Sequence, residues 1–330
     1  MENISNTYQT FKLSGEKGSE ATEHISKPAL TFWQDAWRRF KKNKVAVVAG
    51  AIVILSILFA LVSVAIVPDS SANSAPTNLV TYQNLPPKIG SGDNPTYTSQ
   101  NVPEGTSFIF GTDSNGRSVA KRTVEGFRIS LLIAFMAILF DIVIGITYGL
   151  IAGWVGGVTD TIMQRIIEII SSIPNLVIVT MLGLLLGQGV IAIVLSIGLF
   201  IWVGIARQVR NLVLSVKEQE FVLAAQTLGE SPFKIMLKHI LPNIFGVIIV
   251  QIMFDIPTAI FFEAFLSQIN LGVQPPTASL GSMIQDGVAN FQSYPWQLAV
   301  PAIVLSLISL AFFLFGYGLR DAFDPRATEE

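Results

Sequence analysis

The sequence has no cysteine and few charged residues. None of its 330 residues is cysteine, two are histidine and 13% are charged, whereas about a quarter of the residues of an average soluble domain are charged. The absence of cysteine excludes disulfides, zinc–thiolate sites, thiol catalysis and lipidation on cysteine. Because 51% of the residues are hydrophobic and the mean hydropathy is +0.57, we expect most of the chain to lie in a lipid bilayer.

Motifs of catalysis are also missing. The sequence contains no Gly-x-x-x-x-Gly-Lys-Ser/Thr phosphate loop, no His-Glu-x-x-His zinc helix and no Gly-x-Ser-x-Gly hydrolase motif. A chain without a phosphate loop does not hydrolyse ATP in the usual way. We therefore expect a non-catalytic protein with no cofactor or metal site of its own.

Six long apolar stretches are present. The clearest, Val45 to Val67, has 23 residues without a charge, enough at about 1.5 Å per residue to cross a hydrocarbon core of about 30 Å. Residues 1–30 lack the pattern of a cleavable signal peptide, so we expect this stretch to be retained. The sequence predicts an all-α integral membrane protein with six transmembrane helices. The other five stretches are residues 129–151, 166–186, 189–205, 244–265 and 298–319.

Lysine and arginine beside these stretches predict their orientation, because cytoplasmic flanks are enriched in both. Residues 1–44 are the expected cytoplasmic N-terminal segment, 45–67 the first span and 68–128 an extracellular loop. The other five spans lie in residues 129–319, and six crossings return the tail, residues 320–330, to the cytoplasm. The basic residues before the first span are Arg38, Arg39, Lys41, Lys42 and Lys44.

Two flanking segments have their own character. Residues 68–103 are rich in Ser, Asn, Pro and Thr, which predicts an exposed and poorly structured first part of the extracellular loop. Residues 30–44 combine the basic cluster with Trp33 and Trp37. Because this cluster immediately precedes a span, anchoring to lipid explains it better than binding to nucleic acid. We expect an amphipathic helix on the inner leaflet.

The cytoplasmic loop between the fourth and fifth spans, residues 208–243, has a helix–turn–helix pattern. Apolar residues recur at i, i+3, i+4 and i+7, and Gly229 is a typical helix stop. Ser231 and Pro232 then begin a second apolar helix, which we expect Pro242 to end. Small residues on the first helix allow close approach by a partner protein, although two helices lying on the membrane surface would show the same periodicity. The recurring apolar residues are Phe221, Ala224, Ala225 and Leu228.

This loop, with Glu220, Ala224, Ala225 and Gly229 followed by His239-Ile-Leu-Pro-Asn243, resembles the signature loop of permeases of ATP-driven ABC importers. The family commonly has Glu immediately before Ala-Ala, where this chain has Leu223. Other segments, in the same order, resemble C-type oligopeptide permease subunits of the peptide and nickel branch. They are Phe110-Gly-Thr-Asp-Ser-Asn-Gly-Arg117, Gly149-Leu-Ile-Ala-Gly-Trp-Val-Gly-Gly157, Glu263-Ala-Phe-Leu-Ser267, Leu271-Gly-Val-Gln-Pro-Pro276 and Gly318-Leu-Arg-Asp-Ala-Phe-Asp-Pro325.

The resemblance implies a function and a set of partners. It implies a multi-pass permease of the bacterial cell membrane that imports oligopeptides together with a second homologous permease. Two cytoplasmic ATPase subunits, which bind ATP and magnesium, and an extracellular peptide-binding protein complete the expected complex. The first loop helix is then the coupling helix that contacts an ATPase. The implied coupling residues are Glu220, Phe221, Ala224, Ala225, Thr227, Leu228 and Gly229.

Three acids interrupt the predicted spans. A carboxylate in hydrocarbon is expensive and faces protein or water, so Asp141, Asp255 and Glu263 are candidates for a translocation pathway or a contact between subunits. Each could equally form a hydrogen bond to a neighbouring helix of the same chain. They also keep open an alternative function, a secondary transporter or channel driven by an ion gradient. His239 is expected to cap or pack rather than to relay protons.

Overall fold

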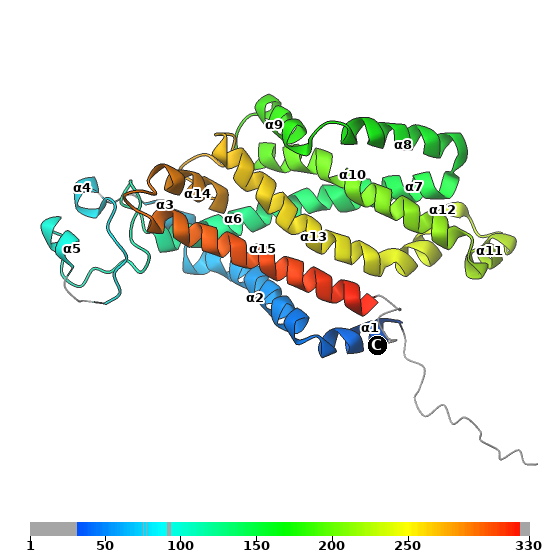
Figure 1. Ribbon diagram of the computed structural model, residues 1–330, viewed down its shortest axis with the longest axis horizontal. Coiled ribbons are helices and arrows are strands. Elements are labelled where there is room, and N and C mark those ends of the chain that lie inside the picture. Colours follow the sequence, from blue (N-terminus) through cyan, green and yellow to red (C-terminus); the bar gives the residue numbers. More distant parts are fainter. Residues whose placement is uncertain (1–31, 75, 77, 91–93, 324–330) are drawn as a thin grey trace, which may run out of the picture.

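The computed structural model describes residues 32–74, 76, 78–90 and 94–323. Within these ranges the regular secondary structure is helical, apart from one antiparallel bridge between Thr112 and Ser118. Figure 1 shows an elongated bundle in which the long helices run roughly along one axis. The predictions for residues 1–31 and 324–330, at the two ends of the chain, lie outside the described residues.

Five helices are long and apolar enough to cross a membrane, and the number is six when the sharply bent helix pair is counted as one span. This confirms the predicted all-α membrane fold. Two π-helical turns, η1 and η2, make α6 continuous with α7 and α12 continuous with α13. The spanning elements are α2 (Lys44–Ile66), α6 (Val119–Phe140) with η1 (Asp141–Ile146) and α7 (Thr147–Val155), the pair α8 (Gly157–Ser171) and α9 (Asn175–Leu186), α10 (Val190–Lys217), α12 (Pro232–Ile235) with η2 (Met236–Ile240) and α13 (Leu241–Gln268), and α15 (Trp296–Phe323).

The third span is bent rather than straight. Helices α8 and α9 meet at an angle of 83° across a short break that contains Pro174. Proline has no backbone N–H and disfavours helical geometry in the residue before it, so a helix tends to end there. The single apolar stretch at residues 166–186 therefore folds as two helices, with Pro174 at the N-cap of α9.

The second span begins earlier than its uncharged stretch. Helix α6 starts at Val119, ten residues before the expected start at residue 129. Its first turns carry charges that have partners in the loop: Arg122 lies 3.6 Å from Asp113, and Asn73 donates a hydrogen bond to Glu125 at 2.7 Å. Because these charges are paired, they do not end the helix. The hydropathy pattern locates the apolar part of α6 but not its extension beyond it.

The long loop between the first and second spans has more structure than its composition predicts. It contains the short helices α3 (Asp69–Asn73), α4 (Leu79–Tyr82) and α5 (Pro95–Ser99). Leu85 and Tyr97 are buried, and Thr112 ties the loop together by accepting a hydrogen bond from the Leu85 N–H at 2.7 Å. Hydrogen bonds and buried side chains thus hold a segment whose Ser, Asn and Pro content alone indicates an unstructured chain.

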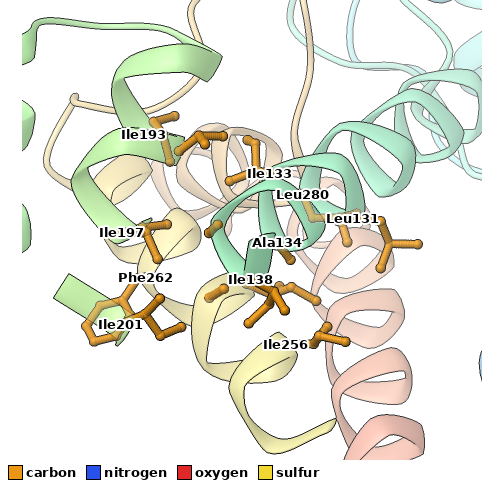
Figure 2. Packing of buried hydrophobic residues seen from close by; sticks show 14 of the residues in the cluster. Leu131, Ile133, Ala134, Ile138, Ile193, Ile197, Ile201, Ile256, Phe262 and Leu280 are labelled. Carbon is orange, nitrogen blue, oxygen red and sulfur yellow. The ribbon is translucent and has the colours of Figure 1, made fainter. Parts of the chain in front are cut away.

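The main hydrophobic core lies where α6, α10 and α13 meet. Figure 2 shows Ile133, Ala134 and Ile138 of α6 facing Ile256 and Phe262 of α13, with side chains from α10 and α14 (Leu280–Ala289) closing the cluster. All of these residues are buried. Complete burial of such side chains stabilises a helix contact by about 1.5–3 kcal/mol each in water, and tight packing takes over that role within a bilayer.

Helices α7 and α10 approach each other backbone to backbone. Gly145, Gly149 and Gly153 follow at intervals of four residues and lie on one face of the helix. A Cβ atom on Gly149 would lie 2.6 Å from the carbonyl oxygen of Ala206, which is too close for a real contact. Small residues at this spacing permit close helix packing in membranes. The glycines therefore fix the distance between these two helices.

The second loop helix continues into the fifth span. Ser231 occupies the N-cap of α12 and Pro232 its first turn, as expected. Pro242, expected to end this helix, lies instead at the start of α13 directly after the π-turn η2. A π-turn spaces its backbone hydrogen bonds differently from an α-helix and so accommodates the missing N–H of a proline. The helix thus runs unbroken from the loop into the membrane.

Candidate coupling surface and buried acids

Helix α11 (Glu220–Thr227), the predicted coupling helix, lies at one end of the molecule. In Figure 1 it projects beyond the ends of α7 and α10, and α4 and α5 occupy the opposite end. It follows α10 after a two-residue link and is followed by the turn that leads into α12. A surface at this position is open to a partner without any rearrangement of the bundle.

One side of α11 packs onto the bundle. Val222 is fully buried and Ala225 is 6% exposed, and both belong to a cluster with Val213 of α10 and Ile235 of α12. Ala225 was expected on the docking face with Phe221, Ala224 and Leu228. The structure places Ala225 and Val222, three residues apart, on the side of α11 that packs against the chain's own core. Ala225 therefore holds the helix in place.

The other side of α11 presents apolar residues to the outside. Phe221 is 42%, Leu223 48% and Leu228 84% exposed, and Ala224 is exposed between them. Glu220, Thr227 and Gly229 are also exposed. The Thr227 hydroxyl donates a hydrogen bond to the Ala224 carbonyl at 2.8 Å. Large apolar side chains exposed together on a loop outside the predicted spans are typical of a protein contact site.

Gly229 ends α11 in a geometry that favours glycine. Its φ angle is +76°, in the left-handed region. The Glu230 N–H donates to the Ala225 carbonyl at 3.1 Å and the Gly229 N–H to the Gln226 carbonyl at 3.0 Å. These two hydrogen bonds form a Schellman motif, which satisfies carbonyls at the end of the helix. The turn that the sequence predicts from Gly229 is therefore capped by backbone hydrogen bonds.

Glu230, in the turn after α11, pairs with the cationic side of the second loop helix. Its carboxylate lies 3.1 Å from Lys234 Nζ and 2.7 Å from His239 Nε2. The hydrogen bond with Lys234 lowers the pKa of Glu230, and His239 lowers this pKa further. His239 thus packs against an acid at the turn, as expected for a structural histidine.

Polar contacts fasten α10 to its neighbours near α11. Arg210 donates from Nε and Nη2 to both carboxylate oxygens of Asp160 on α8, at 2.7 and 2.5 Å. Lys217, the last residue of α10, donates to the carbonyl of Trp154 in the last turn of α7 at 2.5 Å. A cation at the carboxyl end of a helix also interacts favourably with the helix dipole. These contacts connect α7, α8 and α10 at the end that carries α11.

Glu263 is completely buried in α13 and has three hydroxyl partners. Ser279 donates to it at 2.6 Å, Ser130 at 2.9 Å and Ser267 at 3.2 Å. Ser130 also accepts a hydrogen bond from the Leu280 N–H at 3.0 Å. The carboxylate therefore joins α6, α13 and the start of α14 within this chain, and it is not on a surface open to a partner subunit in this conformation.

Asp141 and Asp255 lie together. Asp141 is fully buried at the first residue of η1, and its carboxyl lies next to the carboxyl of Asp255 on α13. Gln251 donates to both oxygens of Asp255, at 3.0 and 3.1 Å. Of the three acids, only Asp255 is partly exposed. No group of three or more metal-ligating side chains occurs among the described residues.

Some residues of these sites were not singled out from the sequence. Val222 and Ser279 carry important contacts, and only Val222 had a usable signal, its three-residue spacing from Ala225. The hydroxyl partners of Glu263 come from three separate helices or helix starts. No local pattern indicates that they converge.

Comparison with known families decides the assignment. Residues 145–329 match the family described as "Binding-protein-dependent transport system inner membrane component". Residues 31–87 match the family described as "N-terminal TM domain of oligopeptide transport permease C". The chain belongs to the binding-protein-dependent transport permease family. The matched region includes α11, and the family members are inner membrane components of ABC transporters rather than catalytic subunits.

Named relatives are similar over nearly the whole chain. The dipeptide transport system permease protein DppC of Lactococcus lactis is 58% identical over 100% of both chains. DppC of Bacillus subtilis is 44% identical over 96% of this chain and 92% of its own length. The oligopeptide transport system permease protein OppC of Bacillus subtilis is 40% identical over 92% of this chain and 93% of its own length. The permease assignment therefore extends over all spans.

Proposed function

We propose that this permease forms half of the translocation pathway of an ATP-driven peptide importer and that α11 is the helix through which ATPase subunits act on it. The observation that carries the coupling role is the two-sided character of α11. Val222 and Ala225 fix one side to the bundle, while Phe221, Leu223 and Leu228 present an apolar surface on the other. A helix that packs against its own bundle on one side and exposes apolar side chains on the other is suited to transmit the motion of a bound partner to the bundle.

The partners follow from this role. Two cytoplasmic ATPase subunits bind ATP and magnesium, and one of them receives α11 in a groove. A second homologous permease completes the pathway, and an extracellular binding protein delivers the peptide. The basic residues before α2 and around α11 support an orientation with both chain ends in the cytoplasm.

Short peptides are the proposed substrates. Two of the relatives above carry the name of a dipeptide transport system and one that of an oligopeptide system. The relative at 58% identity is a dipeptide permease, so we place dipeptides before the longer peptides expected from the sequence. Competition of labelled dipeptide uptake by unlabelled dipeptides and by pentapeptides tests this order. Stronger inhibition by pentapeptides reverses it.

Replacement of Leu228 by Glu tests the coupling surface. Leu228 is 84% exposed and contributes to none of the chain's buried clusters, so the variant is expected to insert and fold normally. Ile89→Glu is the matched control, because Ile89 is 82% exposed in the extracellular loop. Both are measured in purified complexes by co-purification of the ATPases and, after reconstitution in liposomes, by ATP-dependent peptide uptake.

The two variants are expected to differ in peptide uptake and in ATPase binding. In Leu228→Glu a charge is forced into an apolar contact, which should reduce uptake by at least about tenfold, while Ile89→Glu keeps its ATPases. Normal ATPase binding and uptake by Leu228→Glu would remove α11 from the coupling role. Uptake that persists in ATP-depleted vesicles under an ion gradient would instead favour the secondary transporter.

A further inference from the structure

Asp141 is a buried acid without an ordinary donor. It lies within the second span, is fully buried, and neither of its carboxyl oxygens accepts a hydrogen bond from an N–H or O–H group among the described residues. Its polar neighbour is the carboxyl of Asp255 in the fifth span. Most buried polar groups have a hydrogen-bond partner, so this acid calls for an explanation.

The surroundings offer no compensating positive charge. None of the ion pairs formed by the described residues includes Asp141 or Asp255. Gln251, which donates to Asp255, is neutral, and the residues Ile138, Ile142 and Ile256, near the two acids along the chain, belong to the main apolar cluster. Two touching carboxylates without a cation repel each other, and a buried pair of this kind holds a proton between its members.

We propose that Asp141 and Asp255 bind one proton between them and that this shared proton holds the start of η1 against α13. The proton gives Asp141 the hydrogen bond that it otherwise lacks, and Gln251 supplies both oxygens of Asp255 with a donor from the other side. The pair then carries one negative charge in place of two. The ligand of this site is a proton, and both aspartates are positioning residues for the helices.

The backbone at this point supports the proposal. The π-turn begins at Asp141 itself, and such turns are rare and frequently occur at functional sites. Figure 2 shows Ile138 and Ile256 close together in the core, one turn from Asp141 and next to Asp255 respectively. On its other side η1 is fixed to α10, because Gly145 leaves no room for a side chain against Ile205. The pair therefore completes a three-helix junction of α6–η1, α10 and α13.

Infrared spectroscopy of the purified complex tests the proton directly. A protonated carboxyl has a C=O stretching band that shifts in D₂O and is absent from carboxylates and amides. We expect the wild-type-minus-variant spectrum to show the same single band for Asp141→Asn and for Asp255→Asn, since either change removes the one shared acid. No band in either difference spectrum would overturn the proposal.

Thermal stability and peptide uptake give a second, independent readout. Asp141→Asn keeps an N–H donor toward Asp255 and is expected to retain uptake within about twofold of the wild type and an unchanged melting temperature. Asp141→Leu has similar size but no donor, and is expected to lower uptake by about tenfold or more and to melt earlier. Equal impairment of both variants, or none in Asp141→Leu, would contradict a proton-mediated contact.

The shared proton of Asp141 and Asp255 and the coupling role of α11, on which it does not depend, are tested by different variants. The infrared band does not depend on ATPase docking, so Leu228→Glu should leave it unchanged. Loss of the band in Leu228→Glu would mean that the proton reports on the assembled complex, which contradicts a proton held by Asp141 and Asp255 alone.

Discussion

Glu263 and Asp141 are both completely buried within spans, yet their surroundings are opposite. Glu263 accepts hydrogen bonds from three serine hydroxyls, whereas Asp141 has another carboxyl as its polar neighbour. A carboxylate can thus be carried in a membrane helix either by several neutral donors or, as we infer, by sharing a proton. Substitutions that treat the two sites differently should expose this difference.

The largest effect is expected from Glu263→Leu. The change removes an acceptor from three buried hydroxyls, of which Ser279 also begins α14, and leaves polar groups unsatisfied. We expect a loss of roughly 3–4 kcal/mol in the free energy of unfolding, or failure of the complex to assemble. Melting of the purified complex measures it. A loss below about 1 kcal/mol would show that Glu263 is not the junction described.

A smaller loss is expected from Ser279→Ala. The hydroxyl donates to Glu263 at 2.6 Å and, as N-cap of α14, accepts from the Ser282 N–H at 3.0 Å. Losing both contacts should cost about 2 kcal/mol. Ser306→Ala is the control, because Ser306 is exposed and bonds only to a carbonyl of its own helix. Equal melting temperatures for the two variants would argue against the polar junction.

The two buried acids should respond unequally to the same chemical change. Glu263→Gln introduces an amide donor where hydroxyls already donate, with an expected cost of about 1 kcal/mol. Asp141→Asn introduces a donor where one is needed and should be neutral within about 0.5 kcal/mol. Denaturation of the two variants side by side provides the comparison. A larger loss for Asp141→Asn than for Glu263→Gln would contradict the hydroxyl donors assigned to Glu263 and the shared proton assigned to Asp141.

Glu230 supplies a third carboxylate, partly exposed and outside the spans, with the smallest expected effect. Lys234 and His239 lower its pKa, so its contribution is present at neutral pH and is lost as the pH falls through the lowered pKa, below the usual range of glutamate. The protection of α12 amides from hydrogen exchange, relative to their intrinsic exchange rates at each pH, should therefore fall on acidification, and Glu230→Gln should abolish this dependence. An unchanged pH profile in the variant would assign the effect to another group.

The sequence predicts the spans better than the contacts between them. Uncharged stretches indicate apolar helices because the bilayer excludes charge, and the loop motif with Gly229 indicates the capped turn at the end of α11. The contact of Asp141 with Asp255 and the convergence of serines on Glu263 depend on side chains from separate helices. No local period encodes such a contact, so it becomes visible only in the fold.

The local details in which the structure differs from the sequence pattern have the same cause, namely contacts between segments far apart in the chain. Ala225 belongs to the predicted apolar stripe of α11, but the tertiary position of Val222 decides which side of the stripe is covered. Pro242 is a good local stop signal, yet the adjoining π-turn carries the helix through it. Helix α6 extends past its apolar stretch because Asp113 and Asn73 provide partners for its charges. Tertiary partners override the local rule in each case.

The close contact of α7 with α10 has a mechanical consequence. Gly149 and Gly153 leave no slack between the two backbones, and Lys217 fastens their ends. Sliding or tilting one helix past the other would force atoms into overlap, so α7 and α10 are expected to move together as one rigid unit. Val222 of α11 belongs to the same buried cluster as Leu150 and Val213, so a displacement of α11 would move two spans together.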